Sequence, residues 1–294
     1  MPRPVSPLRY PGGKSALAGF LAAVIRANGI SDGTYIEPYC GGAGAALALL
    51  LGEHVRRVVL NDIDPRIYAF WSAAVRRPGT LTKLLAEVPL TIDEWRRQRD
   101  IYRGRLRASR AEVAFATLYL NRCNRSGIIV DGGPIGGIEQ KGKWKLDARF
   151  NRDDLIRRVD RVSWYRDRIS VHSMDAIRLL REVVQPRQDL QTTLVYLDPP
   201  YYHKGQDLYA NFYTPRDHAA LAAFLRSQAT FKWVLSYDDV PEIRELYSGM
   251  EQFTFNIPYC AHTRKSGREL LVCSDGLILP QGSTFARGLA SVAV

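Results

Sequence analysis

Four consecutive residues, Asp198-Pro199-Pro200-Tyr201, have the types and the order needed to hold a planar ring that carries an amine. They follow an apolar run, Leu194–Leu197, that is typical of a buried strand, so we expect them at the carboxyl end of a sheet, where α/β folds bind ligands. The two prolines fix φ and remove two N–H donors, which leaves carbonyl oxygens free to accept. Asp198 adds a carboxylate and Tyr201 adds a stacking face. A proline-stiffened loop without a ligand is the alternative.

A second group of residues has the features of a nucleoside-cofactor site. The turn Glu37-Pro38-Tyr39-Cys40-Gly41-Gly42-Ala43-Gly44 joins a predicted strand to an Ala/Leu-rich helix over 44–51. Glycines let a ligand approach the backbone, and a helix N-terminus offers free N–H donors. Asp62 ends the next predicted strand, where a carboxylate can accept from ribose hydroxyls. For the glycines alone, a purely structural turn is the alternative.

The glycine turn favours S-adenosylmethionine over a nicotinamide dinucleotide. A dinucleotide usually needs a G-x-G-x-x-G cradle for its pyrophosphate, and this turn reads G-G-A-G-A-A. Glu37 opens the turn, and its negative charge would repel a pyrophosphate. A cofactor with a cationic sulfonium and an ammonium group would tolerate that charge.

The pattern of apolar runs predicts an open, doubly wound α/β fold. Strand, glycine turn, helix and strand form a βαβ unit, which implies a parallel sheet. Seven strands with helices between most of them are expected. The predicted strands are 34–39, 58–62, 169–173, 194–198, 232–237, 253–257 and 269–273.

The interval between the second and third strands is too long for a simple crossover. We therefore predict a catalytic domain formed by residues 1–77 and 167–280, a mainly helical insertion over 78–166 with a helix at 110–120, and a tail over 281–294. Residues 90–168 carry 19 Lys+Arg against 11 Asp+Glu, so +8 of the chain's net +11 lies in this region. That concentration favours a polyanionic partner over a merely basic protein.

Other features narrow the class of protein. No apolar run reaches the ~20 residues needed to span a bilayer. The run Ala16–Ile25 is predicted to be a surface helix, with a signal-peptide core as the alternative. The four scattered cysteines favour reduced thiols in a cytoplasmic protein, and no His/Cys cluster predicts a metal site. We expect a monomer.

In the order of its motifs the chain resembles the Dam-like family of DNA adenine-N6 methyltransferases (D12 class, alpha type). The matching segments span most of the chain and are Arg9-Tyr10-Pro11-Gly12-Gly13-Lys14, IEPYCGGAG, LNDID, LYLNRCNRSG at 118–127, and LDPPY. The resemblance implies a class I S-adenosylmethionine-dependent methyltransferase fold, which is Rossmann-like. It also implies an inserted target-recognition subdomain.

The resemblance also implies roles for residues in the cofactor and base pockets. Tyr10, Gly12, Gly13 and Lys14 would bind the cofactor, Lys14 through the cofactor's carboxylate, and Asp62 would bind the ribose. Asp175 would contact the cofactor's adenine, with a helix N-cap as the equal alternative. The remaining cofactor residues would be Glu37, Pro38, Gly41, Gly42, Gly44 and Asp198. Asp198 and the Pro199 carbonyl would hold the target amine beside Pro200, and Tyr201 would stack on the base.

The implied partner is double-stranded DNA, with the target adenine flipped into the pocket. The segment 201–213, rich in aromatic residues, would close over the base, with an ordinary surface loop as the alternative. The predicted DNA contacts are Arg9, Asn121, Arg122, Asn124, Arg125, Ser126, Lys141 and Lys143. Between 125 and 130 the sequence departs from the GATC-specific members, so GATC recognition is not predicted.

Several rival functions keep the fold. The acceptor could instead be an RNA adenine, a cytosine N4 or a protein glutamine, and a catalytically silent DNA-binding relative is the rival from another class. Serine in place of Asp198 would favour cytosine N4, and asparagine would favour glutamine. The intact DPPY, glycine turn and Asp62 argue against a silent relative.

Overall fold

Parallel strands dominate the computed structural model of the chain, which describes residues 5–9, 14–203, 213–258, 266–280 and 290–291. The strands are β1 (Thr34–Glu37), β2 (Arg57–Asn61), β3 (Ile169–His172), β4 (Thr193–Leu197), β5 (Lys232–Asp238), β6 (Gln252–Pro258), β7 (Ser266–Cys273) and β8 (Ala290–Ser291). The seven predicted strands are all present. β8 was not predicted, because two residues carry no readable periodicity; it pairs with β6 opposite Phe253 and Thr254.

The sheet order is β3-β2-β1-β4-β5-β7-β6-β8. Strands β1 to β5 pair in parallel, whereas β7 is antiparallel to both β5 and β6. The predicted mostly parallel α/β sheet is therefore confirmed. The direction in which the chain adds strands reverses between β1 and β4, so the carboxyl ends of these two neighbours form a topological switch point.

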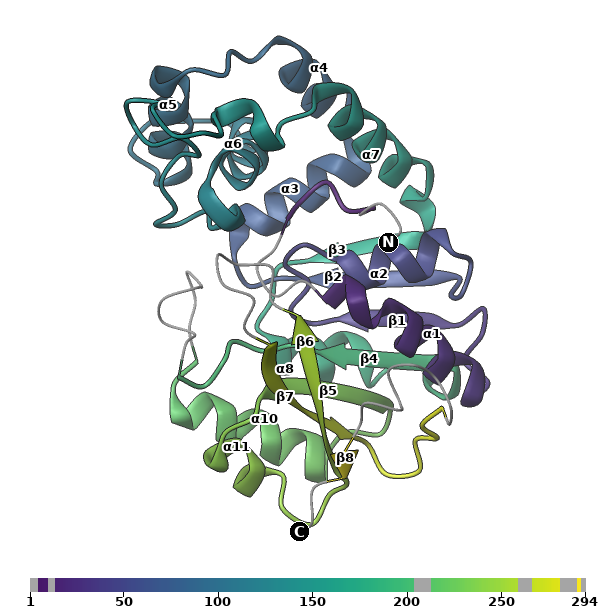
Figure 1. Cartoon of the computed structure of the whole chain (residues 1–294). Helices are drawn as coiled ribbons and strands as arrows, with labels where there is room; N and C mark the ends of the chain where they lie inside the picture. The colour runs from purple at the N-terminus through teal and green to yellow at the C-terminus, as the bar shows by residue number, and fades with distance from the viewer. Residues whose placement is uncertain (1–4, 10–13, 204–212, 259–265, 281–289, 292–294) are drawn as a thin grey trace.

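Helices cover both faces of the sheet (Figure 1). They are α1 (Ala18–Ala27), α2 (Gly44–Leu51), α3 (Pro65–Arg76), α8 (Ala176–Leu179), α10 (Pro215–Ser227) and α11 (Pro241–Leu246), with the short helices η1 (Lys14–Leu17), η5 (Leu180–Val184) and η6 (Leu190–Thr192). In β4, Leu194 and Tyr196 pack in the cluster that contains α1 to α3, whereas Val195 and Leu197 pack in the one that contains α8, α10 and α11. Such strands read as continuous apolar runs because both faces are buried.

The long interval between β2 and β3 is mainly helical, and Figure 1 shows its helices gathered beyond the β3 edge of the sheet. They are α4 (Pro78–Glu87), α5 (Ile92–Tyr102), α6 (Arg110–Cys123) and α7 (Arg152–Trp164), with η2 (Arg125–Gly127), η3 (Leu146–Arg149) and η4 (Arg166–Arg168). Their buried side chains belong to the same hydrophobic cluster as α1 to α3. The domain boundaries at 77 and 167 stay predictions.

Local signals explain where the main insertion helix begins. Ser109 and Glu112 form a capping box at the start of α6, in which each side chain accepts from the other residue's backbone N–H. The predicted helix over 110–120 continues to Cys123 because its last turn is buried in the core. No helix among the described ranges has the length and apolarity to cross a membrane.

Candidate active site

The two predicted motifs meet at the switch point. Ile36 of β1 pairs with Val195 of β4, so the glycine turn after Glu37 and the DPPY segment after Leu197 leave the sheet side by side. This adjacency is a property of the strand order, because 160 or so residues separate the motifs along the chain. The carboxyl ends of β1 and β4 therefore bring the predicted cofactor turn beside the predicted base-binding residues.

Asp198 is held by one of its two carboxylate oxygens. Ser236 Oγ on β5 donates to Asp198 Oδ1 at 3.1 Å, and Lys14 Nζ lies 3.4 Å from the same oxygen. Within the described part of the chain, nothing donates to Oδ2 or to the carbonyl oxygen of Pro199. The side chain of Asp198 is 25% exposed. One carboxylate oxygen is thus anchored while the other, with the proline carbonyl, is available as an acceptor.

Lys14 lies at the centre of a buried ionic cluster. Its Nζ donates to Glu269 Oε1 at 2.8 Å and to Oε2 at 2.6 Å, and it lies 3.4 Å from the hydroxyl of Tyr201. The Tyr201 hydroxyl in turn donates to Glu269 Oε1 at 2.8 Å. Lys14 is 5% exposed and Glu269 is fully buried. In this structure the ammonium therefore faces protein carboxylates.

Glu269 and Ser236 are site residues that the sequence analysis missed. Both lie within apolar strands, β7 and β5, and neither belongs to a recognisable motif. The one available signal was the position of Glu269, an acidic residue directly before the apolar run Leu270–Cys273. A charged residue in a central strand is rarely buried unless it is paired, but the sequence does not reveal the partner.

Burial and neighbouring charges together set the pKa values of Asp198 and Lys14, which face each other in the cluster. Burial raises the pKa of Asp198 to about 6, and the nearby Lys14 ammonium opposes part of that rise. Burial lowers the pKa of Lys14, but the charges of Asp198 and Glu269 outweigh it, so the net pKa is raised. Lys14 therefore stays cationic at neutral pH, and Asp198 is mostly ionised but close to its midpoint.

The glycine turn is fixed by contacts on several sides. Asp62 accepts from the backbone N–H groups of Gly41 and Asp64, each at 3.0 Å. Trp71 Nε1 donates to the Gly41 carbonyl at 2.8 Å, and Ser6 Oγ donates to the Gly42 carbonyl at 2.6 Å. Gly41 has φ +41°, a backbone conformation that favours glycine. Gly44 begins α2, so the turn directs a helix N-terminus toward the switch point.

The family can now be identified by comparison with known proteins. The D12 class of N6 adenine-specific DNA methyltransferases matches residues 10–266, most of the chain. The chain belongs to this family. A search of curated proteins finds no match. Among solved structures it is similar to the rRNA methyltransferase aviRa from Streptomyces viridochromogenes, at 16% identity over 90% of this chain and 86% of that one, with a TM-score of 0.34. The fold is assigned from the order and direction of the strands.

The chain is thus an adenine-specific DNA methyltransferase, and membership of this family implies the use of S-adenosylmethionine. The environment of Glu37 differs from that of the charged carboxylate that the sequence suggested. Glu37 Oε1 accepts from the Tyr35 hydroxyl at 3.1 Å and from the Ala46 N–H in the first turn of α2 at 3.0 Å. Burial raises the pKa of Glu37 to about 8. The predicted repulsion of a pyrophosphate by this carboxylate stays a prediction, and the raised pKa makes that repulsion weaker in the free protein than an ionised carboxylate would give.

Asp175 and Pro38 have structural roles in the methyltransferase. Asp175 is exposed and caps α8, since its Oδ1 accepts from the N–H of Arg178 at 2.9 Å. The helix-cap alternative is therefore present, and the contact with the cofactor's adenine stays a prediction. The carbonyl of Pro38 accepts from Asn61 Nδ2 at 2.8 Å, which fixes the turn against β2. Tyr10, Gly12, Gly13 and the loop residues 204–212 lie outside the described residues.

Three predicted DNA contacts are buried in this structure, and their role in DNA binding stays a prediction. Asn121 accepts from the Arg9 N–H at 2.7 Å, and Arg122 donates through Nε to the Pro7 carbonyl at 2.7 Å. Asn124 accepts from Trp95 Nε1 at 2.7 Å. All three are at most 6% exposed. Their polar atoms bind the N-terminal segment and the core of the insertion, so they are not available to base edges or phosphates.

The remaining predicted DNA contacts also stay predictions. Arg125, Lys141 and Lys143 are exposed, and Ser126 is half-buried with φ +56°. Arg9 is half-buried and directly precedes the cofactor motif. Lys141 forms an exposed ion pair with Glu139, which contributes little to stability.

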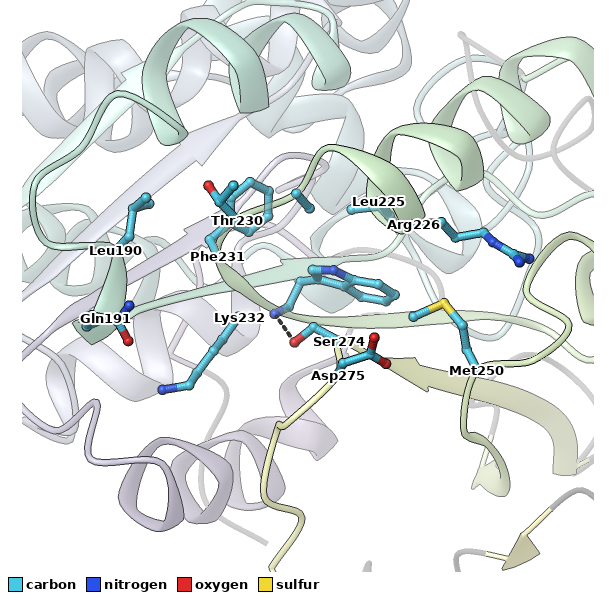
Figure 2. A pocket seen from close by; sticks show the side chains of 12 residues that line it. Leu190, Gln191, Leu225, Arg226, Thr230, Phe231, Lys232, Met250, Ser274 and Asp275 are labelled. Carbon is cyan, nitrogen blue, oxygen red and sulfur yellow. Dashed lines mark hydrogen bonds between the residues drawn. The ribbon is translucent and has the colours of Figure 1, made fainter.

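A cavity of about 250 Å³ lies away from the site, at the amino end of β5 (Figure 2). Its lining includes Phe231, Trp233 and Asp275, and Ser274 Oγ accepts from the Trp233 N–H there. None of the predicted site residues lines it. Among the described residues, no group of three or more His, Cys, Asp or Glu side chains could hold a metal ion.

We expect the substitution Arg122→Leu to lower the free energy of unfolding by about 1–3 kcal/mol, because it leaves buried carbonyls without a donor. Urea denaturation measures this loss. The matched control is Arg125→Leu, since that side chain is exposed and only three positions away. Equal stability of the two variants would contradict the structural role of Arg122.

Proposed function

We propose that the enzyme methylates the N6 amine of an adenine flipped out of double-stranded DNA, with S-adenosylmethionine as donor, and that Asp198 and the Pro199 carbonyl hold that amine. One observation carries the proposal. Asp198 is anchored through Oδ1, and its Oδ2 and the adjacent proline carbonyl have no donor among the described residues. Two fixed acceptors at the switch point match the two N–H groups of an exocyclic amine.

The residues at the glycine turn fit a nucleoside cofactor with a cationic end. Asp62 keeps acceptor capacity beyond its two backbone bonds, and it directly follows β2 beside the turn. Glu37 uses only Oε1 in its described bonds. Burial raises the pKa of Asp62 to about 7, so an approaching cation would favour the ionised form of this carboxyl group. When bound, the cofactor supplies a methyl group on a positively charged sulfur.

In this proposal the protein residues orient the target amine. The amine of adenine is a poor nucleophile because its lone pair is delocalised into the ring. Acceptors at Asp198 and Pro199 would draw the amine toward tetrahedral geometry and direct its lone pair at the methyl group. The methyl group would pass from the cofactor's sulfur to the amine, whose N–H would then become acidic, and Asp198 Oδ2 would accept the released proton. No enzyme nucleophile is needed.

Tyr201 and the insertion would supply the contacts to DNA. The hydroxyl of Tyr201 is bound to Glu269, which fixes the ring that would stack on the flipped base. Arg125, Ser126, Lys141 and Lys143 lie in the strongly basic part of the chain and would contact the duplex, with Arg9 at the edge of the site. The proposed set omits Asn121, Arg122 and Asn124, whose side chains are buried.

Incubation with methyl-labelled S-adenosylmethionine and plasmid DNA tests the proposal directly. After digestion to nucleosides, label is expected in N6-methyladenine. Parallel reactions contain single-stranded DNA, RNA and protein. Label confined to RNA, protein or N4-methylcytosine would reject the proposed substrate.

Replacing Asp198 by Asn should reduce methyl transfer by about 100-fold or more, because an amide oriented by Ser236 and Lys14 offers the amine a weaker acceptor or a donor. Cofactor affinity, measured by calorimetry, should remain measurable. The control is Asp189→Asn, an acidic residue that pairs with Arg187 and lies before the amino end of β4. Full activity of Asp198→Asn would remove this residue from the mechanism.

The activity should fall as the pH drops through about 6. The pKa of Asp198 is raised to about 6 by burial. The ionised form is the stronger acceptor for the amine, so protonation weakens the bond that orients it. kcat/KM measured between pH 4.5 and 8 reports this ionisation in the free enzyme. His218 cannot account for it, since burial lowers its pKa to about 4. An acid limb centred near 4 would contradict the assignment.

Arg125→Ala should weaken DNA binding and reduce the slope of log K against log salt by about one. Fluorescence anisotropy at several salt concentrations measures both quantities. The control is Arg178→Ala, an exposed arginine paired with Glu182 on α8. An unchanged slope in Arg125→Ala would show that this residue contacts no phosphate.

A further inference from the structure

Glu269 is a fully buried acid that the proposed chemistry does not use directly. It lies on β7, just beyond the last residue of the family match at 266. Both of its oxygens accept from Lys14 Nζ, and Oε1 also accepts from the Tyr201 hydroxyl. An isolated buried carboxylate costs several kcal/mol, and the Lys14 ammonium offsets part of that cost.

We propose that Glu269 is a positioning residue that holds the Lys14 ammonium away from Asp198, so that Asp198 keeps an oxygen free for the target amine. The inference rests on the proposed function of Asp198. The carboxylates of Glu269 and Asp198 compete for the Lys14 ammonium, and the distances show that it lies closer to Glu269. Lys14 Nζ lies 2.6 Å and 2.8 Å from the oxygens of Glu269 but 3.4 Å from Asp198 Oδ1.

Loss of the charge on Glu269 changes this competition. Among the described residues, Asp198 is then the remaining carboxylate in contact with Lys14. The ammonium would move onto Asp198, occupy its lone pairs and lower its affinity for a proton. The Tyr201 hydroxyl would lose its charged acceptor at the same time. One acid on β7 thereby controls both the acceptor and the ring of the DPPY segment.

The groups that face Asp198 determine whether its pKa rises or falls when Glu269 loses its charge. Lys14 lowers the pKa of Asp198, whereas Glu269 raises it by its charge. From β5, Ser236 donates to Asp198 and lowers the pKa. Glu37, on β1, is mostly uncharged at neutral pH. Removal of the Glu269 charge and a closer Lys14 therefore act in the same direction, toward a lower pKa of Asp198.

The test uses Glu269→Gln, which keeps the size and a hydrogen-bond acceptor but removes the charge. We expect kcat to fall about 10- to 100-fold, and the acid limb of kcat/KM to move to a pH below that of the wild type. Glu269→Asp, which keeps the charge, should restore the limb and part of the rate. A merely structural role would lower activity equally at every pH, so an unmoved limb would overturn the proposal.

A second variant separates capture of Asp198 from loss of packing. In the double variant Lys14→Gln/Glu269→Gln, no ammonium remains to occupy Asp198. At saturating cofactor it should be more active than Glu269→Gln alone, a non-additive result that a double-mutant cycle quantifies. A double variant no more active than the single one would also overturn the proposal.

The inference can fail independently of the proposed function. A titration of ¹³C-labelled Asp198 by NMR, in the free full-length protein, reports the midpoint of this carboxyl group without any turnover. The midpoint should be lower in Glu269→Gln than in the wild type, and an equal midpoint rejects the positioning role. If the wild type forms no N6-methyladenine but the midpoint falls, the proposed function fails while the electrostatic role of Glu269 stands.

Discussion

The side-by-side pairing of β1 with β4 is the constraint on which the rest of the site depends. Because Thr34, Tyr35 and Ile36 pair with 193–195 in parallel, the chain must leave both strands at the same edge of the sheet. The glycine turn and the DPPY segment meet there, although neither is near the other in sequence. β5 and β7 lie on the other side of β4 from β1, and they bring Ser236 and Glu269 to the same edge.

The electrostatics of the site follow from burial at this edge. Carboxyl groups on three neighbouring segments have raised pKa values, about 8 for Glu37, 7 for Asp62 and 6 for Asp198. Lys14 is the ammonium that opposes the rise at Asp198, and it is held mainly by Glu269. Groups that ionise reluctantly in the free enzyme become easier to ionise when a cation arrives. A cationic donor therefore suits this edge better than an anionic one.

Polar residues of the insertion show that residue type does not determine role. Arg122 and Arg125 are three positions apart, yet the first donates to backbone carbonyls of the N-terminal segment and the second is exposed. Burial lowers the pKa of Arg122 to about 9, because its guanidinium is removed from solvent. The basic insertion thus contains both structural arginines and candidate DNA contacts, and their accessibility distinguishes them.

The sequence alone determined the features that local patterns encode. Apolar runs located seven strands, and proline and glycine spacing located the DPPY and cofactor turns, because backbone restriction and alternation act within a few residues. Only the tertiary structure decided that Glu269 pairs with Lys14, 255 positions away, and that Asn121 and Arg122 are buried. Burial and ion pairing depend on which distant segments pack together. No local pattern of residues contains that information.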